Sequence, residues 1–362
     1  MKIVVLAHEN DNHTAPIRWG LEQAGYKVAC WGGVSWTEER QASIEFDGSA
    51  QMNLAAFALE PGDVVWIRRP NPAELHPNTA EPDKKFSEGE YRWFSMSLLY
   101  LLETFPVRCV NPYSASRFIN NKSVQLVLAE RCGMRVPRTL MSNTPGDVRA
   151  FLENSHHKTI CKGFFPHIWK KDDSEALAVT ETFEITASQL PADEVLTYAP
   201  AIYQEMVAKQ FDVRMVLMGE TIYSYSIRTP KGRLDWRQDT AQGLVEIETI
   251  ETPPEVAQAA LAFARQARLT FGSLDFAVDN DGRWWFLEIN EQGQFLWLEQ
   301  FGSGINIMQK FLSFLTLPEG ATQEEIESRE TQFPPLRDYE TSEAGKEAKP
   351  EPNAGKIFVS TE

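Results

Sequence analysis

The sequence has 362 residues, of which 43% are hydrophobic and 24% are charged, a composition typical of a globular protein. Its 35 Lys and Arg residues face 51 Asp and Glu residues, and the net charge of −16 argues against a nucleic-acid binder, which needs a basic face. Its apolar runs are shorter than the ~18 residues of a membrane span and its four cysteines form no CxxC pair, so we expect a cytoplasmic protein without a zinc site.

The first 110 residues alternate strand-like and helix-like segments. The predicted strands are residues 2–7, 27–31, 63–67 and 107–110, and the predicted helices are residues 17–25 and 88–104. This alternation is typical of a parallel sheet covered by helices, with a surface loop at residues 70–88. A dinucleotide-binding fold is the competing interpretation, but the turn after the first strand, AHENDNH, lacks the GxGxxG pattern. We therefore expect an N-terminal α/β domain over residues 1–110.

Asn111 and Pro112 mark a boundary, after which we expect two α+β units, residues 111–200 and residues 201–318. In the first unit the predicted helices are residues 119–131 and 147–154, and the predicted strands are residues 138–141 and 159–162. In the second unit the predicted strands are residues 202–207, 213–218, 221–227, 271–279 and 283–289, and the predicted helices are residues 253–268 and 305–315. A tight hairpin is expected at Gly219-Glu220.

The last segment, residues 319–362, differs in composition from the rest. It has 11 acidic and 5 basic residues and almost no apolar periodicity. A segment of this kind buries too little apolar surface to fold. We therefore expect a disordered acidic tail.

One predicted hairpin carries the most specific pattern in the sequence. Asp281-Gly282 is a favoured two-residue turn, which would pair Asn280 with Arg283. Counting back along both strands places Asp275 opposite Glu288. Two opposed carboxylates repel each other unless something compensates for their charge.

Asn290 lies two residues from Glu288 and therefore shares its face of the sheet. Two carboxylates and an amide oxygen on one face predict a divalent cation, Mg²⁺ or Mn²⁺, because these ions prefer oxygen ligands. An ordinary solvated sheet face is the alternative interpretation, and we expect Asp279, near the turn, to be exposed. The alternate positions are apolar and predicted to face the core: Leu274, Phe276, Val278, Trp285, Leu287 and Ile289.

A metal site with three oxygen ligands commonly serves nucleotide phosphates, which also attract cations. Lys122 begins a helix and Lys162 ends a strand before a glycine, so both are candidates, although each alone could be a surface charge. No GxxxxGK[ST] motif is present, which excludes a P-loop.

A possible adenine-binding strand lies at the start of the second α+β unit, residues 201–318. The strand that contains Gln204, Glu205, Met206 and Val207 ends in an acid followed by apolar residues, and such a strand can pair its backbone with an adenine edge. Asp212 could accept hydrogen bonds from ribose hydroxyls.

Three arginines recur on successive predicted strands or loops of the same α+β unit. Arg214, Arg228 and Arg237 could bind a carboxylate or an acyl phosphate as bidentate donors, or could pair with nearby acids.

The order of these residues resembles the ATP-grasp superfamily, and within it the microviridin-type graspetide ligases, which modify ribosomally made peptides. RimK-like glutamate ligases are similar but more distant. The resemblance covers residues 1 to about 316. Its specific motifs are VWIRRP at residues 65–70, VNPYSASRFINNK at 110–122, LDWRQD at 234–239 and LEINEQGQFLWLE at 287–299. The sequence departs from these families at Glu291, where they usually have proline.

The resemblance implies an ATP-grasp fold in which ATP lies between residues 111–200 and residues 201–318. It implies that Lys122 and Lys162 hold phosphates, that Glu205 and Val207 meet the adenine, and that Asp212 meets the ribose. It further implies roles for two groups: Asp275, Glu288 and Asn290 as ligands of a metal pair, and Arg214, Arg228 and Arg237 as neutralisers of the γ-phosphate and the acyl phosphate.

The implied reaction phosphorylates a side-chain carboxylate, after which a hydroxyl or amine attacks it. The implied partner is a ribosomal precursor peptide with a leader segment, and a homodimer is left open. Two alternatives stay open: a ligase that joins an amino acid to a small molecule or protein tail, and an ATP-binding scaffold without catalysis.

Overall fold

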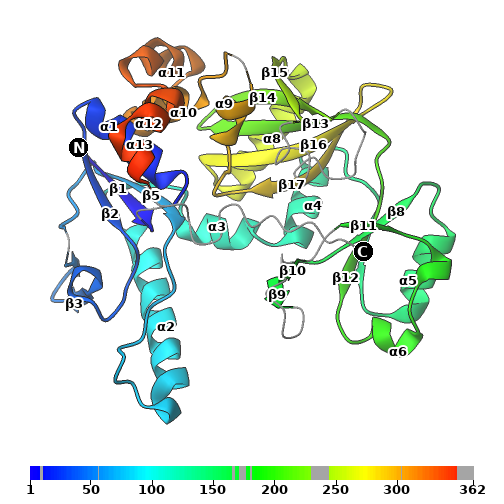
Figure 1. The fold of residues 1–362 in the computed structure, drawn as a ribbon, viewed down its shortest axis with the longest axis horizontal. Helices are drawn as coiled ribbons and strands as arrows, with labels where there is room; N and C mark the ends of the chain where they lie inside the picture. Colours follow the sequence, from blue (N-terminus) through cyan, green and yellow to red (C-terminus); the bar gives the residue numbers. More distant parts are fainter. Residues whose placement is uncertain are drawn as a thin grey trace.

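The computed structural model describes residues 1–8, 11–55, 57–164, 168–170, 177–179, 182–229, 244–302 and 304–348. Within these residues, a parallel sheet forms the N-terminal part and antiparallel sheets form the rest (Figure 1). The mixed α/β architecture predicted from the sequence is confirmed.

The N-terminal sheet has the strand order β2-β1-β5-β6, and all its strands are parallel. Its strands are β1 (Lys2–Ala7), β2 (Lys27–Trp31), β5 (Val64–Arg69) and β6 (Arg108–Val110). The helices beside it are α1 (Thr14–Gln23) and α2 (Lys84–Leu102). The apolar run of β1 suits an inner strand that is covered on both faces, and Ile3, Val4 and Val5 are completely buried.

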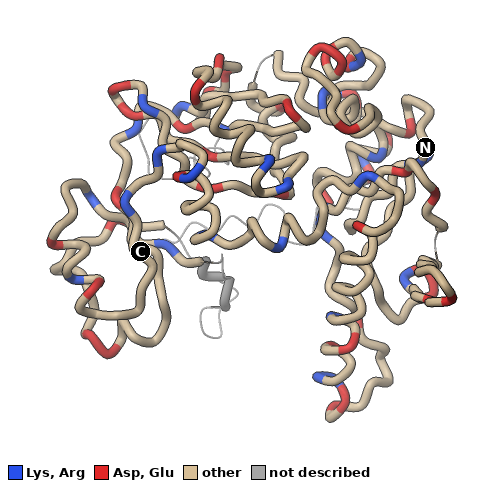
Figure 2. Tube along the Cα trace, turned by 180° about the vertical axis from the view of Figure 1, so that it is seen from behind, with Lys and Arg blue, Asp and Glu red and all other residues tan. Residues whose placement is uncertain are grey.

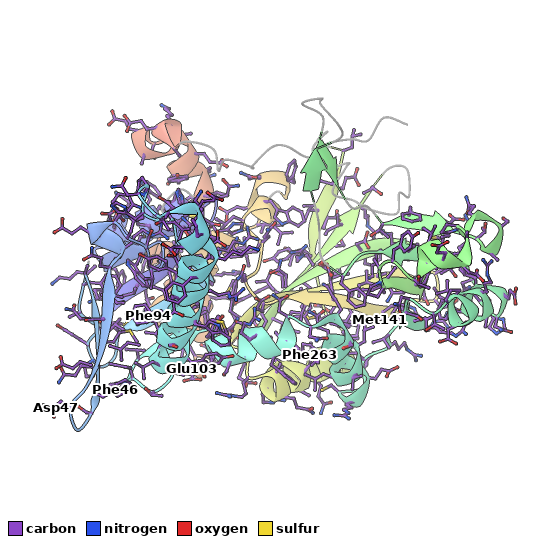
Figure 3. All side chains as sticks on the ribbon, turned by 90° about the horizontal axis from the view of Figure 1, so that it is seen from below. Phe46, Asp47, Phe94, Glu103, Met141 and Phe263 are labelled. Atoms are coloured by element: carbon purple, nitrogen blue, oxygen red, sulfur yellow. The ribbon has the colours of Figure 1, made fainter. Side chains whose placement is uncertain are left out.

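A small antiparallel hairpin, which sequence reasoning missed, follows β2. It consists of β3 (Ala42–Phe46) and β4 (Ala50–Leu54). Figure 3 shows Phe46 and Asp47 at its tip, away from the body, and Phe46 is 74% exposed. The short 3-10 helices among the described residues are η1 (Glu38–Arg40), η2 (Glu81–Asp83), η3 (Ala187–Gln189) and η4 (Glu330–Gln332).

The central part is built on an antiparallel sheet with the order β11-β8-β12-β7. Its strands are β7 (Thr139–Ser142), β8 (Thr159–Lys162), β11 (Phe183–Ile185) and β12 (Ala201–Glu205). The accompanying helices are α5 (Pro145–Glu153) and α6 (Asp193–Leu196), and a separate strand pair is formed by β9 (Ile168–Lys170) and β10 (Leu177–Val179). Val148 and Phe151 of α5 pack on Cys161 and Tyr203 of the sheet.

The predicted helix at residues 119–131 begins three residues later, as α4 (Lys122–Arg131), and a helix that was not predicted, α3 (Tyr113–Ile119), precedes it. Asn121 separates them because its Oδ1 accepts a hydrogen bond from the N–H of Ser123 at 3.1 Å and thereby caps α4. This cap places Lys122 in the first turn of α4.

The largest sheet is five-stranded and antiparallel, with the order β15-β14-β13-β16-β17. Its strands are β13 (Lys209–Met218), β14 (Thr221–Arg228), β15 (Glu246–Ile250), β16 (Phe271–Asp279) and β17 (Trp284–Asn290). The predicted hairpin between β13 and β14 is confirmed, since Met218 pairs with Thr221 and Gly219 has a φ of +64°. The described helices that accompany this sheet are α8 (Pro254–Ala267), α9 (Trp297–Phe301) and α10 (Ile307–Thr316).

Helix α10 connects the largest sheet to the N-terminal sheet. The ring of Phe311 lies 5.0 Å from that of Trp66 in β5 and 4.6 Å from that of Phe271 in β16. On the other face of the largest sheet, α8 buries Phe263 against Phe286 at 5.5 Å. The N-terminal and C-terminal parts therefore share one continuous core.

The expectation of a disordered tail is wrong for residues 319–348. These residues form α11 (Gln323–Arg329), α12 (Leu336–Thr341) and α13 (Glu343–Glu347), which lie beside α1 in Figure 1. Phe333 is 3% exposed and stacks 6.0 Å from Tyr26, and Tyr339 lies 5.6 Å from Trp19. A few well-placed apolar residues thus dock the segment despite its acidic composition; residues 349–362 lie outside the described part.

Acidic and basic residues are both distributed along the described chain. In the view of Figure 2, Lys and Arg are interspersed with Asp and Glu along the described chain. No helix among the described residues is long and apolar enough to cross a membrane.

Candidate functional site

The hairpin of β16 and β17 pairs Asp275 with Glu288, as the sequence predicts. The turn itself differs from the prediction. Asp279, rather than Asn280, is opposite Arg283, because the N–H of Asp279 donates to the carbonyl of Arg283 at 3.0 Å. The loop between them therefore has three residues.

A β-bulge compensates for the longer turn. Leu287 is the extra residue, since the register shifts after Asp275 and Phe276 pairs with Phe286. A one-residue shift turns a strand's side chains to the opposite face. Trp284 and Phe286 consequently pack in the core, whereas Trp285 and Leu287 line cavities, the reverse of the predicted alternation on β17. The other predicted core positions are in the core: Leu274, Phe276, Val278 and Ile289.

Asp279 is not exposed as predicted, because it is only 6% exposed. Its Oδ2 accepts hydrogen bonds from Arg283 Nε at 2.8 Å and from Trp285 Nε1 at 2.9 Å. Burial alone would raise its pKa, but these bonds and those from two backbone N–H groups hold the pKa well below the ordinary value. Asp279 therefore stabilises the turn in its ionised form.

Each of the two facing carboxylates is paired with a cation. Asp275 is 8% exposed, and its Oδ1 lies 2.7 Å from Nε of Arg214 on the neighbouring strand β13. Glu288 pairs with Lys122, which the N-terminus of α4 presents to β17. The Oδ1 of Asn290 accepts from the backbone N–H two residues later at 3.1 Å.

The donor set suits a hard divalent cation, because it consists of two carboxylates and an amide oxygen. Asp275 pairs with Glu288, and Asn290 pairs with Ser273 two positions away on the same strand pair. Among the described residues, no three His, Cys, Asp or Glu side chains gather into a metal site, and this set has only two acids. The residues fit Mg²⁺ through their chemistry, with Arg214 and Lys122 beside them.

A cavity of about 160 Å³ lies between the central sheet and the largest sheet, beside the facing carboxylates. Eight of the predicted site residues line it: Lys162, Gln204, Glu205, Met206, Val207, Asp212, Asp275 and Glu288. The structure therefore brings together residues that are up to 126 positions apart in the sequence.

Polar contacts fix several side chains of this cavity. Lys162 Nζ donates to Gln204 Oε1 at 3.1 Å, and Gln204 is 2% exposed. Lys209 Nζ donates to both oxygens of Asp212, at 2.9 and 2.7 Å. Sequence reasoning missed Lys209; its position three residues before Asp212 was the available signal.

The end of β12 and the residues that follow it lead from the central sheet to the largest sheet, and two backbone N–H groups there donate hydrogen bonds within the protein. The N–H of Glu205 donates to the carbonyl of Arg138 at 2.9 Å, and the N–H of Met206 donates to that of Lys158 at 2.7 Å. Within the described residues, no hydrogen bond engages the N–H of Val207. This N–H is therefore available to a ligand in the cavity that Val207 lines.

Two of the three predicted arginines, Arg214 and Arg228, do not converge. Arg214 is 3% exposed and its guanidinium lies 5.6 Å from the centroid of the Trp297 ring. Arg228 is exposed and packs over Phe211 at 4.2 Å, outside the residues that line the cavity. Arg237 lies outside the described residues.

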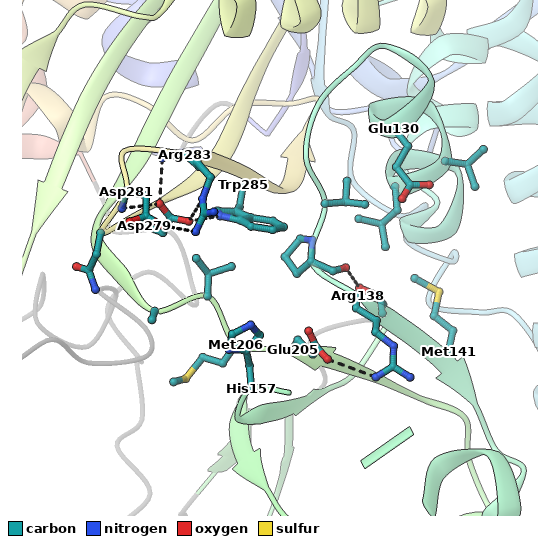
Figure 4. A pocket seen from close by; sticks show the side chains of 18 of the residues that line it. Glu130, Arg138, Met141, His157, Glu205, Met206, Asp279, Asp281, Arg283 and Trp285 are labelled. Atoms are coloured by element: carbon teal, nitrogen blue, oxygen red, sulfur yellow. Dashed lines mark hydrogen bonds and ion pairs between the residues drawn. The ribbon is translucent and has the colours of Figure 1, made fainter. Parts of the chain in front are cut away.

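A second, larger cavity of about 1040 Å³ shares Glu205, Met206 and Val207 with the first. Figure 4 shows Arg283 and Trp285 on one side of it and Glu205 near Arg138 on the other. None of the predicted metal ligands lines it. Despite its size, it is therefore not the candidate nucleotide site.

The fold is that of ATP-grasp ligases. It superposes with a TM-score of 0.75 on a RiPP-associated ATP-grasp ligase from Chryseobacterium gregarium, solved with ADP and a leader and core peptide, at 20% identity over 89% of this chain and 99% of that chain. The macrocyclase MdnC from Microcystis aeruginosa, bound to its precursor peptide MdnA, matches with a TM-score of 0.71 at 22% identity over 87% and 99% of the two chains.

The ATP-grasp ligase PsnB, complexed with a phosphomimetic variant of its minimal precursor, Mg and ADP, matches with a TM-score of 0.65 at 22% identity over 87% and 97% of the chains. No protein-family model and no curated protein sequence matches the chain. The predicted likeness to ligases that modify ribosomal peptides is confirmed at the level of the fold.

Proposed function

We propose that this chain is an ATP-grasp ligase that uses ATP and Mg²⁺ to form ester or amide cross-links in a ribosomally synthesised precursor peptide. One observation carries the proposal: a single cavity is lined by Lys162 and Gln204 from the central sheet and by Asp212, Asp275 and Glu288 from the largest sheet. In this proposal, residues 111–200 and 201–318 are the two halves that enclose the nucleotide.

The nucleotide is held by residues on both halves. Val207 supplies a backbone N–H to the adenine edge, and Glu205 supplies its carbonyl. Asp212, fixed by Lys209, accepts from the ribose hydroxyls. Lys162 holds phosphate oxygens, and Gln204 orients the Lys162 ammonium group through their contact at 3.1 Å.

Asp275, Glu288 and Asn290 hold the metal, which when bound neutralises the phosphate charge that develops during transfer. Lys122 at the start of α4 lies next to Glu288 and adds a second cation at the phosphates. Arg214, held between Asp275 and the carbonyl of Gln294 at 2.9 Å, faces the same charge. Arg228 and Arg237 remain candidates for the same role from the neighbouring strand and the segment after it.

The reaction proceeds in two steps. A side-chain carboxylate oxygen of the peptide attacks the γ-phosphorus, the bond to the bridging oxygen breaks, and ADP leaves. A hydroxyl or amine then attacks the carbonyl carbon of the acyl phosphate, loses its proton and expels inorganic phosphate. The residues above stabilise charge in the first step and hold the leaving phosphate in the second.

The peptide substrate is supported by the solved neighbours, which were solved in complex with a leader and core peptide, with a precursor peptide or with a variant of a minimal precursor. The test substrate would come from a short reading frame next to the gene for this chain, if that frame encodes a peptide rich in Thr or Ser together with Asp and Glu. The purified chain, incubated with that peptide, ATP and Mg²⁺, is expected to release one ADP for each water lost from the peptide mass.

A peptide without its leader segment should be modified much more slowly, and the leader added in trans should restore part of the rate. Equal ADP release with free glutamate or with the leaderless peptide would contradict the peptide substrate and favour a small-molecule ligase. No ADP release with any carboxylate would contradict a ligase of either kind.

A further inference from the structure

The loop after β17, residues 291–296, meets the N-terminal sheet directly after the predicted metal ligand Asn290. Arg68, near the end of β5, is 1% exposed and points into this loop. Its Nη1 donates to the carbonyl of Gln292 at 2.8 Å and to that of Gly293 at 2.9 Å. A fully buried arginine with two backbone acceptors in a loop more than 220 positions away fixes the path of that loop.

Two other buried side chains, Asp11 and His13, contribute to the contact, beside Arg69 and Asn111, which donate to Gln292 Oε1 at 3.1 Å and to the carbonyl of Glu291 at 2.8 Å. Asp11 Oδ1 lies 3.3 Å from Arg68 Nε and accepts from the N–H of His13 at 2.9 Å. His13 Nε2 accepts from the N–H of Phe295 at 3.0 Å and from that of Leu296 at 3.3 Å. Burial first, and the charge of Arg68 next, lower the pKa of His13 well below its ordinary value, so the neutral ring keeps the lone pair that these N–H groups need.

The same loop is connected to the candidate metal site at two points. The N–H of Gln292 donates to Asn290 Oδ1 at 3.1 Å, which sets the orientation of the amide oxygen. The carbonyl of Gln294 accepts from Arg214 Nη1 at 2.9 Å, and Arg214 in turn pairs with Asp275. The position of the loop backbone therefore decides the positions of two predicted ligands.

We propose that Arg68, Asp11 and His13 form a clamp that positions loop 291–296 and thereby sets the affinity of the metal site. The inference rests on the proposed function, which assigns the cation to Asn290 and Asp275. It gives the N-terminal sheet a role in metal binding although the predicted ligands all lie on the largest sheet. Partners one step removed from metal ligands typically change metal affinity by about 10–100-fold when they are replaced.

The test is Mn²⁺ binding to the full chain in saturating ADP, followed by electron paramagnetic resonance. His13→Ala removes the acceptor for the Phe295 and Leu296 N–H groups and is expected to raise the Mn²⁺ dissociation constant by about 10-fold. ADP binding in EDTA should not change, because His13 is not among the residues that line the cavity. His13→Gln, which keeps an acceptor near the position of Nε2, should restore most of the affinity.

Asp63→Asn is the matched control for a merely structural effect. Asp63 lies just before β5, at its opposite end, is 2% exposed, and accepts from the N–H of Lys2 at 2.7 Å and from that of Glu60 at 3.0 Å. This variant should lower the melting temperature but leave Mn²⁺ affinity at the wild-type value. If His13→Ala does not fold, Arg68→Lys, which loses the two-pronged contact, serves in its place with the same expected loss.

Wild-type Mn²⁺ affinity in the clamp variant, or an equal loss in Asp63→Asn, would overturn the clamp and leave the proposed ligase function standing. A wild-type chain that binds no Mn²⁺ with ADP would overturn the proposed function, and the inference would fall with it.

Discussion

Asp275→Asn and Glu288→Gln make the same chemical change on two facing residues, yet we expect very different effects on stability. The side chains of Asp275 and its partner Arg214 are 12% and 4% exposed, whereas those of Glu288 and its partner Lys122 are 29% and 28% exposed. Removing one member of a buried ion pair leaves the other charge uncompensated and costs about 3–5 kcal/mol. A partly exposed pair contributes at most about 1 kcal/mol.

The substitution at Asp275 also relieves its repulsion with Glu288, so we expect the lower end of the range, about 3 kcal/mol. Both variants should lose ADP release with the peptide substrate, because each removes a charged ligand of the proposed metal site. The free energy of unfolding is measured by urea titration in EDTA, with a check that the dependence on urea concentration stays constant. Equal losses of stability in the two variants would refute the reasoning from burial, and wild-type ADP release in either variant would remove that residue from the metal site.

The other predictions concern the C-terminal segment, the turn and the nucleotide. Phe333→Ala should lower the free energy of unfolding by about 3–5 kcal/mol because Phe333 is 3% exposed. Phe46→Ala at the hairpin tip should change it by no more than about 0.5 kcal/mol. Equal unfolding curves for the two variants would show that the C-terminal segment does not dock. The pKa of Asp279 lies below its ordinary value of 3.8, so its ionised form stabilises the fold above that pH and the benefit disappears as the pH falls further. The stability difference between wild type and Asp279→Asn should therefore shrink on acidification from neutral pH to well below 3.8, and a constant difference would contradict this. Lys162→Ala should weaken ATP binding by about 10–100-fold, the value of a hydrogen bond to a charged group. The control is Lys158→Ala at an exposed position, which should bind ATP as wild type does. Equal affinities of the two variants in calorimetry would exclude Lys162 from the phosphate site.

The pairing of Asp275 with Glu288 was predictable because both lie on strands with strong local apolar patterns. The prediction assumed a two-residue turn and a regular ladder, and the structure has a three-residue turn and a bulge at Leu287. These two departures cancel at Asp275, so its pairing with Glu288 is as predicted. They do not cancel in the part of β17 that lies between the turn and the bulge, which is why the faces of Trp284 and Trp285 were exchanged. A bulge depends on how the strand packs against its neighbours, and the alternation of a single strand does not contain that information.

The C-terminal segment shows a different limit. Its average composition predicts disorder, yet Ile326, Phe333, Leu336 and Tyr339 are all less than 10% exposed. Docking depends on where a few apolar side chains fall and on a complementary surface beside α1, neither of which an average reports. A local signal was present, because Thr322 and the side chain three residues later form a capping box that starts α11.

The charge of the cavity could not be derived from the sequence, although the net charge of −16 made it a central question. Three of the predicted site residues, Asp212, Asp275 and Glu288, are acidic, and an anionic nucleotide would be repelled by them if they stood alone. In the structure, each of these acids has a cation from another position in the chain; the pairs are Asp212 with Lys209, Asp275 with Arg214, and Glu288 with Lys122. Lys162 lines the same cavity and contacts the neutral Gln204 at 3.1 Å. An acidic protein can therefore present a site suited to phosphates and a divalent cation, because the pairing is local while the surplus of acid lies elsewhere on the chain.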